Sequence, residues 1–223
     1  MLFKENEMNP TYIVGASGAA KEIYYLIKKI NQVKMTFDFR GFLDLNPKSI
    51  ELKIGSKTFP ILDESQFIQN QKVDCNIVFG IAFPDRLRPI IEKYTSHSSF
   101  HFPNIIHPYI QLDESVTLGK GNVIAESSIF TVDIALGDFN FVNRGVHIGH
   151  DVIIGNANVI NPSAVVSGGI HIKNNNLIGT NATIIQYLNI DSGNTIGAGA
   201  VVTKSISNNT TVIGVPAKPI KND

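Results

Sequence analysis

The sequence has a single cysteine, no tryptophan and no surplus of charge of either sign. A lone Cys75 excludes a disulfide framework and a zinc site of several thiolates, and it suits a reducing compartment, so a cytoplasmic location is expected. Nineteen Lys and Arg residues balance nineteen Asp and Glu residues, which argues against a nucleic-acid partner. The chain also lacks any apolar run of about 18 residues, so no membrane partner is expected.

A repeat of six residues runs through the second half of the chain. Every sixth residue from Ile106 to Val202 is apolar, without interruption. In a chain that is 43% apolar, chance produces seventeen such residues in a row on the order of once in a million. The residue that follows is often glycine, as at positions Gly119, Gly137, Gly149, Gly155, Gly179 and Gly197.

This period indicates a coil with three sides. Six residues fit neither the 3.6-residue helix nor a continuous strand, but they fit a short strand and a corner repeated three times per coil. Each repeated apolar residue then points inward and stacks on its counterpart about 4.8 Å away in the next coil. The sequence therefore predicts a prism of short parallel strands over residues 105–223.

The first half of the chain shows a different pattern. Strands are expected at residues 11–14, 37–44 and 76–79, and helices at residues 19–30 and 64–70. Strand, helix, strand, helix, strand in this order predicts a small Rossmann-like parallel sheet. We expect it to form an α/β domain over residues 1–104.

Glycines follow the first strand of this domain and point to a nucleotide. Gly15 and Gly18, with Ser17 between them, place backbone amides at a helix N-terminus, where they meet an anion such as phosphate. Asp44 is placed to bind a ribose hydroxyl, and Gly80 would let a base approach. The full dinucleotide fingerprint is missing, which favours a mononucleotide-bearing ligand over NAD. The alternative explanation of the glycines is tight packing between strand and helix.

The two halves together resemble a known family. The resemblance rests on the Gly-x-Ser-Gly motif and on residues 143–155 (NRGVHIGHDVIIG), 196–204 (IGAGAVVTK) and 214–218 (GVPAK). These segments are similar to the bacterial nucleotide-sugar N-acetyltransferases and sialic acid O-acetyltransferase-like enzymes among the hexapeptide-repeat acyltransferases. The resemblance implies that the prism is a left-handed parallel β-helix, that the protein is a homotrimer, and that acetyl-CoA binds to the β-helix. It also implies that the first domain binds a nucleotide-linked amino sugar.

One histidine stands out as a candidate general base. His150 lies two residues after the inward Ile148, which predicts a corner from which the ring leaves the prism. The resemblance places the family's general base here, and Asp151 would orient the imidazole. His147 and His171 each precede an inward residue, so we expect them to be surface residues on flat faces.

The resemblance implies further contacts with acetyl-CoA. Gly168 would offer its backbone amide to the thioester oxygen, and Asn143 would contact the sugar, unless it is simply a corner asparagine. The remaining implied cofactor contacts are Gly179, Thr180, Gly197, Ala198, Lys204 and Lys218, although the two lysines could equally be solvated surface residues. The chain departs from the family at Val159 and Ala19, where relatives often have histidine.

These features predict transfer of acetyl from acetyl-CoA to the amino group of a UDP-, dTDP- or GDP-linked sugar, by direct attack. O-acetylation of a sugar or sialic acid is the alternative, and a non-catalytic nucleotide-sugar-binding scaffold is a third reading. A zinc hydrase of the same architecture would need three converging imidazoles. His147 and His171 are separated by one coil plus one face and do not stack, so no metal is expected.

Overall fold

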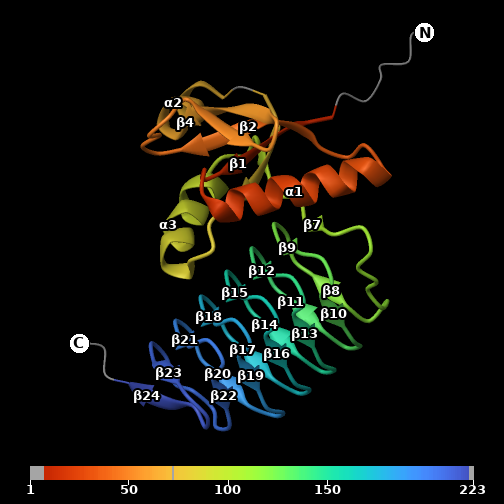
Figure 1. The fold of residues 1–223 in the computed structure, drawn as a ribbon, viewed down its shortest axis with the longest axis vertical. Coiled ribbons are helices and arrows are strands. Elements are labelled where there is room, and N and C mark those ends of the chain that lie inside the picture. The colour runs from red at the N-terminus through yellow and green to blue at the C-terminus, as the bar shows by residue number, and fades with distance from the viewer. Residues whose placement is uncertain (1–7, 72, 221–223) are drawn as a thin grey trace. The chain divides into compact units, whose positions relative to one another are not determined.

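The computed structural model of the protein describes residues 8–71 and 73–220. The chain divides into two compact units (Figure 1). The first contains Met1–Ile81 and Ile91–Pro108, and the second contains Ala82–Ile90 and Tyr109–Asp223. No helix among the described residues is both long enough and apolar enough to cross a membrane.

A mostly parallel sheet forms the centre of the first unit. Its strands lie in the order β3-β4-β2-β1-β5-β6, and only β3 runs antiparallel to its neighbour. The strands are β1 (Pro10–Val14), β2 (Asp38–Asp44), β3 (Glu51–Ile54), β4 (Lys57–Asp63), β5 (Cys75–Phe79) and β6 (Phe100–His101). The carboxyl ends of β1, β2 and β5 lie at the same edge, since these three strands are parallel neighbours.

The helices of the chain are α1 (Gly18–Val33), α2 (Glu64–Asn70) and α3 (Pro84–Thr95). Helix α1 forms because its buried residues recur at helical spacing along one face: Ala20, Ile23, Tyr24, Leu26 and Ile27. Asp63 caps the N-terminus of helix α2, because its carboxylate accepts a hydrogen bond from the Gln66 amide at 2.8 Å.

The strands and helices predicted for the first half are all present, but the sequence reading missed four elements. The β3–β4 hairpin extends the sheet at one edge and β6 extends it at the other. Helix α3 was missed because it contains Pro89, and a proline inside a segment argues against a helix. The hairpin was missed because its first strand is largely exposed and gives no run of apolar residues. A short strand β7 (Ile105–Ile106) follows β6 in the chain.

The second unit is a stack of three-sided coils, as the six-residue period predicts (Figure 1). One face carries β10 (Ile129–Phe130), β13 (His147–Ile148), β16 (Val165–Val166), β19 (Thr183–Ile184) and β22 (Val201–Val202). The second face carries β8 (Thr117–Leu118), β11 (Ala135–Leu136), β14 (Ile153–Ile154), β17 (His171–Ile172) and β20 (Asn189–Ile190). The third carries β9 (Val123–Ile124), β12 (Phe141–Val142), β15 (Val159–Ile160), β18 (Leu177–Ile178), β21 (Thr195–Ile196), β23 (Thr211–Ile213) and the antiparallel β24 (Lys218–Ile220).

Through most of these faces a residue pairs with the residue eighteen positions later, so the repeated apolar side chains stack inside the prism; the last parallel pair, β21 with β23, is sixteen residues apart. Ile148 pairs with Val166 and Ile154 with Ile172, and all four are buried. Ile106, Leu112 and Leu118, at the start of the series, are only half-buried. Leu118 has a neighbouring strand on one side only, because β8 is the edge of its sheet.

A ladder of buried asparagines runs along one corner of the prism. Asn122, Asn140, Asn158, Asn176 and Asn194 are spaced by eighteen residues and all are buried. Each side-chain oxygen in the middle of the ladder accepts the backbone amide of the next member, as from Asn158 to Asn140 at 2.9 Å. The ladder supplies partners for amides inside the corner, where water would otherwise be needed.

Candidate active site

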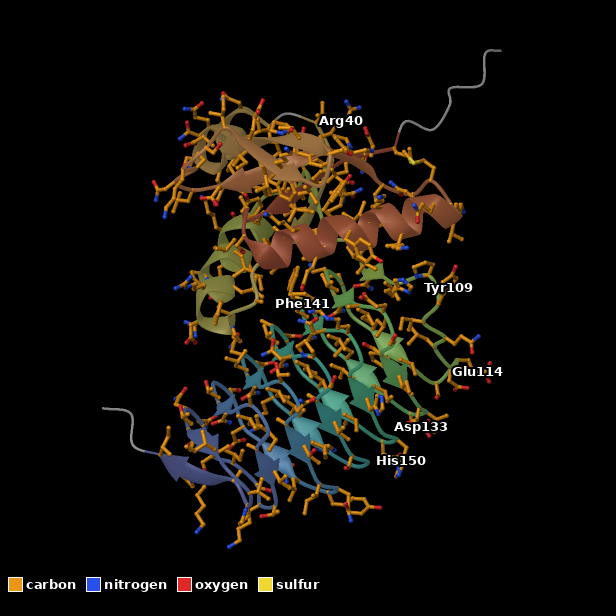
Figure 2. All side chains as sticks on the ribbon, viewed as in Figure 1. Arg40, Tyr109, Glu114, Asp133, Phe141 and His150 are labelled. Carbon is orange, nitrogen blue, oxygen red and sulfur yellow. The ribbon has the colours of Figure 1, made fainter. Side chains whose placement is uncertain are left out.

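His150 and Asp151 form a corner between β13 and β14. Asp151 has a φ of 57°, in the left-handed region that Asp tolerates better than most residues. The same sharp turn repeats in neighbouring coils, and it directs the side chains at the corner outward. Figure 2 shows Glu114, Asp133 and His150 in succession along this edge. The expected corner position of His150 is therefore observed.

The two side chains are hydrogen-bonded to each other. His150 Nδ1 lies 2.7 Å from Asp151 Oδ2, with both side chains more than half exposed. An ionised carboxylate only accepts, so Nδ1 must carry the hydrogen. In the neutral ring Nε2 is then left with its lone pair, which is the form that acts as a general base.

The imidazole lies against a glycine of the next coil. A Cβ added to Gly168 would lie only 2.5 Å from His150 Nε2 and 2.6 Å from Cε1. The ring therefore occupies space that any other residue at position 168 would fill. Gly168 does more than permit a backbone contact, because its missing side chain makes room for the base.

The Gly168 amide is also free to donate. At another corner of the prism, backbone amides in the equivalent position are capped by side chains of the following coil. Asp138 Oδ1 accepts the Lys120 amide, and Asn156 Oδ1 accepts the Asp138 amide. Among the described residues, the backbone N–H of Gly168 has no hydrogen-bond partner. A lone donor beside Nε2 is suited to binding an oxygen that becomes negative during acyl transfer.

The other histidines of the β-helix lie where the sequence predicted. His147 and His171 are exposed on different faces, in β13 and β17. Among residues 8–71 and 73–220, no group of three or more His, Cys, Asp and Glu side chains is arranged to hold a metal ion.

Several other candidate residues stack at a different corner. Asn143, Gly179 and Gly197 occupy equivalent positions along one corner, with Asn161 in the coil between Asn143 and Gly179, and Thr180 and Ala198 follow the two glycines. Within one chain they do not share the corner of His150 and Gly168. A Cβ on Gly179 would lie 2.5 Å from the Ala198 amide nitrogen, so close stacking of coils already requires this glycine.

The polar candidates of the β-helix differ in exposure. Asn143 is buried and its side-chain oxygen accepts the Arg144 amide at 3.0 Å, which gives it a structural function. Lys204 and Lys218 are exposed. Val159, where relatives often have histidine, is fully buried in β15, on a face that does not adjoin the His150 corner.

The glycines of the first unit meet at the carboxyl edge of its sheet. The Gly15 amide donates to Leu43 O at 2.7 Å, and the Gly80 amide donates to Val14 O at 2.8 Å. Gly15 has a φ of 99°, and a Cβ on Gly80 would lie 2.8 Å from that of Ala20. Both glycines are therefore required for packing, whatever they bind.

The N-terminus of α1 is open at this edge. Ser17 is the N-cap but its side chain makes no capping hydrogen bond, and a Cβ on Gly18 would meet nothing within 4 Å. Ala19, the second position at which the sequence differs from the family that it resembles, is half-buried in the first turn. Asp44 ends β2 and accepts the Asn46 amide at 3.0 Å through one carboxylate oxygen. The edge thus combines open amides with a carboxylate.

One feature near the His150 corner was missed by the sequence reading. A cleft of about 610 Å³ lies between residues 109–113 and the strand β10 with its flanks, Ser128–Val132. Leu112 belongs to the six-residue series, but residues 109–116 form no strand and stand outside the regular coils, so the pattern does not predict their position correctly.

Comparison with solved structures shows the family to which this architecture is similar. The acetyltransferase domain of PglB from Neisseria gonorrhoeae is 26% identical, with a TM-score of 0.83 over 95% of this chain and 100% of that one. WeeI from Acinetobacter baumannii is 27% identical, with a TM-score of 0.83 over 96% and 100%. The chain has the fold of the hexapeptide-repeat acetyltransferases. PerB from Caulobacter crescentus, solved with CoA and GDP-perosamine, shares the fold at 24% identity, with a TM-score of 0.83 over 96% and 98%.

These similarities confirm the fold predicted from sequence, an α/β domain followed by a left-handed β-helix, and the predicted class of enzyme, an acetyltransferase. No model of a protein family matches the chain, and no curated protein matches it by sequence.

Proposed function

We propose that the protein transfers an acetyl group from acetyl-CoA to the amino group of a nucleotide-linked sugar. The observation that carries this is the corner at which His150 Nε2 lies against Gly168, whose amide is free to donate. A base and an oxyanion donor side by side are the two groups that acyl transfer to an amine needs. The PglB domain was also solved in complex with acetyl coenzyme A, at 25% identity to this chain.

In this mechanism His150 Nε2 takes a proton from the amine while the nitrogen attacks the thioester carbonyl carbon. The Gly168 amide stabilises the negative oxygen of the tetrahedral intermediate. The carbon–sulfur bond then breaks, and the thiolate of CoA leaves with the proton that His150 returns. Asp151 stabilises the transient imidazolium through its 2.7 Å hydrogen bond to Nδ1. No covalent acyl-enzyme is formed.

The two parts of the chain have different functions in this proposal. Residues 1–104 bind the nucleotide sugar by its nucleotide, with the open N-terminus of α1 at Gly15, Ser17 and Gly18 meeting phosphate, Asp44 meeting the ribose, and the strand-end glycine Gly80 beside them. Residues 105–223 bind acetyl-CoA.

The remaining candidates contact the substrates along the β-helix: Asn143 the sugar, and Gly179, Thr180, Gly197, Ala198, Lys204 and Lys218 the cofactor. Self-association as a homotrimer and a cytoplasmic location belong to the same proposal. The resemblance to the family supports the trimer, because it implies that acetyl-CoA binds between neighbouring subunits. Light scattering of the purified protein checks the trimer directly.

The experiment that tests the activity is a panel of acceptors. The protein is incubated with labelled acetyl-CoA and UDP-, dTDP- or GDP-linked amino sugars, alongside the same nucleotides linked to the corresponding hydroxy sugars. Label on an amino sugar nucleotide supports the proposal. Label only on hydroxy sugars would assign O-acetylation, and label on neither would overturn acetyl transfer to this substrate class.

A further inference from the structure

The cleft next to the His150 corner lies within the second unit and is formed by two stretches of chain. On one side are Tyr109, Gln111, Leu112 and Asp113, and on the other are Ser128, Ile129, Phe130, Thr131 and Val132. Its volume of about 610 Å³ is in the range of small-molecule sites. The lining mixes apolar, hydroxyl, amide and carboxylate groups, as a site for a sugar requires.

Backbone hydrogen bonds join the cleft to the coil of His150. The Thr131 amide donates to Ile148 O and the Asp151 amide donates to Val132 O, each at 3.2 Å. Val132 thus precedes His150 in the same column of corner residues. Gly168 follows His150 in that column, on the opposite side. The imidazole therefore stands between the cleft and the proposed oxyanion donor.

The segment that closes the cleft is held in place by a chain of hydrogen bonds. The Asp133 amide donates to Ser115 Oγ at 2.8 Å, and Ser115 Oγ donates to Asp113 Oδ1 at 2.6 Å. The Ser115 amide also donates to Asp113 Oδ1, at 3.0 Å. Asp113 is thereby fixed relative to Asp133, which lies one coil before Asp151 at the same corner as His150.

Asp113 gives the cleft a negative charge. The two hydrogen bonds from Ser115 lower the pKa of the Asp113 carboxyl below its ordinary value, so the group is ionised at neutral pH. Only Oδ1 is used by these bonds among the described residues. No lysine or arginine is among the residues that line the cleft.

We propose that this cleft binds the amino sugar ring of the acceptor, with Asp113 recognising the amine in its ammonium form. A sugar amine is protonated when it arrives from neutral solution, and a fixed carboxylate is its natural partner. The bound ammonium loses this first proton to water to reach the nucleophilic amine. His150 then takes the second proton as the nitrogen attacks, as in the mechanism above, and returns it to the CoA thiolate. The inference rests on the proposed function, since it places the acceptor on one side of His150 and the thioester on the other.

The test separates recognition of the amine from support of the fold. Asp113→Asn keeps an oxygen that accepts both Ser115 hydrogen bonds but removes the charge. We expect its KM for the best amino sugar nucleotide of the panel to rise about 10-fold or more, with the KM for acetyl-CoA unchanged. Inhibition by the matching hydroxy sugar nucleotide should not weaken, because that analogue carries no ammonium group.

Two further variants complete the experiment. Thr131→Trp fills the cleft and leaves residue 113 as Asp, and it should also raise the KM for the acceptor alone. Glu51→Gln, which removes an exposed carboxylate from β3, is the matched control and should leave both KM values unchanged. If Asp113→Asn and Thr131→Trp both acetylate the sugar with the KM of the wild type, the cleft is not the acceptor site. If the wild type acetylates no amino sugar, the proposed function itself has failed.

Discussion

At the scale of single residues, the candidate site consists of a base, its partner and an absent side chain. The hydrogen bond to Asp151 fixes the tautomer of His150, and Gly168 leaves room for the ring. A half-exposed histidine is ordinary on a protein surface. The adjacent lone amide of Gly168 is what distinguishes this one, because it supplies the second group that acyl transfer needs.

Replacing His150 by Ala should lower kcat at least about 100-fold, the usual effect of removing a general base. Steady-state kinetics with the acceptor found in the panel measures this, and circular dichroism checks that the fold is intact. His171→Ala is the matched control, since His171 is exposed on another face of the β-helix. An unchanged kcat in His150→Ala would show that another group takes the proton.

Gly168→Ala should lower kcat about 10-fold or more, because the new Cβ would collide with His150 Nε2 and displace the ring. The KM for the sugar should change little, since the substitution acts on the reacting groups. Ser167→Ala, the neighbouring position, serves as the control. Wild-type kcat in Gly168→Ala would mean that the imidazole has another position during catalysis.

At the scale of elements, the β-helix depends on repetition. Most two-residue strands bury one or two apolar side chains and pair with similar short strands above and below, so no strand is stable alone. The asparagine ladder also depends on repetition. Each asparagine in it forms its hydrogen bonds only because the next coil places another asparagine directly above.

Asn158→Ala should therefore destabilise the β-helix by about 3 kcal/mol, because it leaves buried groups without hydrogen-bond partners. The wild-type side chain accepts the Asn176 amide and donates to Asn140 Oδ1 and Lys173 O. Urea unfolding followed by circular dichroism measures the free energy of unfolding. Asn189→Ala, at an exposed position in β20, should change it by less than about 0.5 kcal/mol. Equal stability of the two variants would contradict the structural function of the ladder.

At the scale of the whole molecule, the chain forms two compact units with different kinds of core, a sheet packed with helices and a stack of repeated coils. The first is a sheet with helices, and its core includes the fully buried Cys75 in β5. Burial, with a smaller contribution from the charge of Asp74, raises the pKa of this thiol to about 12. The thiol therefore stays protonated in the folded state at pH values where it would ionise in the unfolded chain.

This difference predicts how stability changes with pH. The stabilisation is fully present below the ordinary thiol pKa of 9.0 and is lost as pH rises toward about 12. Between about pH 8 and pH 10.5 the contribution of Cys75 to the free energy of unfolding should fall by about 2 kcal/mol. The measurement is urea unfolding of the first unit, followed through its helical circular dichroism, for the wild type and Cys75→Ala. Parallel pH profiles for the two proteins would show that the thiol is not buried as described.

The sequence alone determined the β-helix and the corner position of His150. A six-residue period is a local property repeated in every coil, so the pattern fixes which residues face inward and which lie at corners. Short apolar runs also located β1, β2 and β5 of the first unit, although Arg40 interrupts the run in β2. Helix α3 and the β3–β4 hairpin lack such patterns, and the sequence reading missed both.

Only the tertiary structure decided how residues eighteen positions apart combine. Stacking of coils brings Gly168 against the His150 ring, leaves the Gly168 amide without a cap, and sets the cleft of Asp113 beside the same corner. The six-residue period does not predict any of these contacts. It predicts whether a residue faces inward or lies at a corner, but not which side chain of the next coil lies beside it. The chemistry at the corner depends on which side chains neighbouring coils place there, and these side chains differ from coil to coil in a way that the regular repeat does not specify.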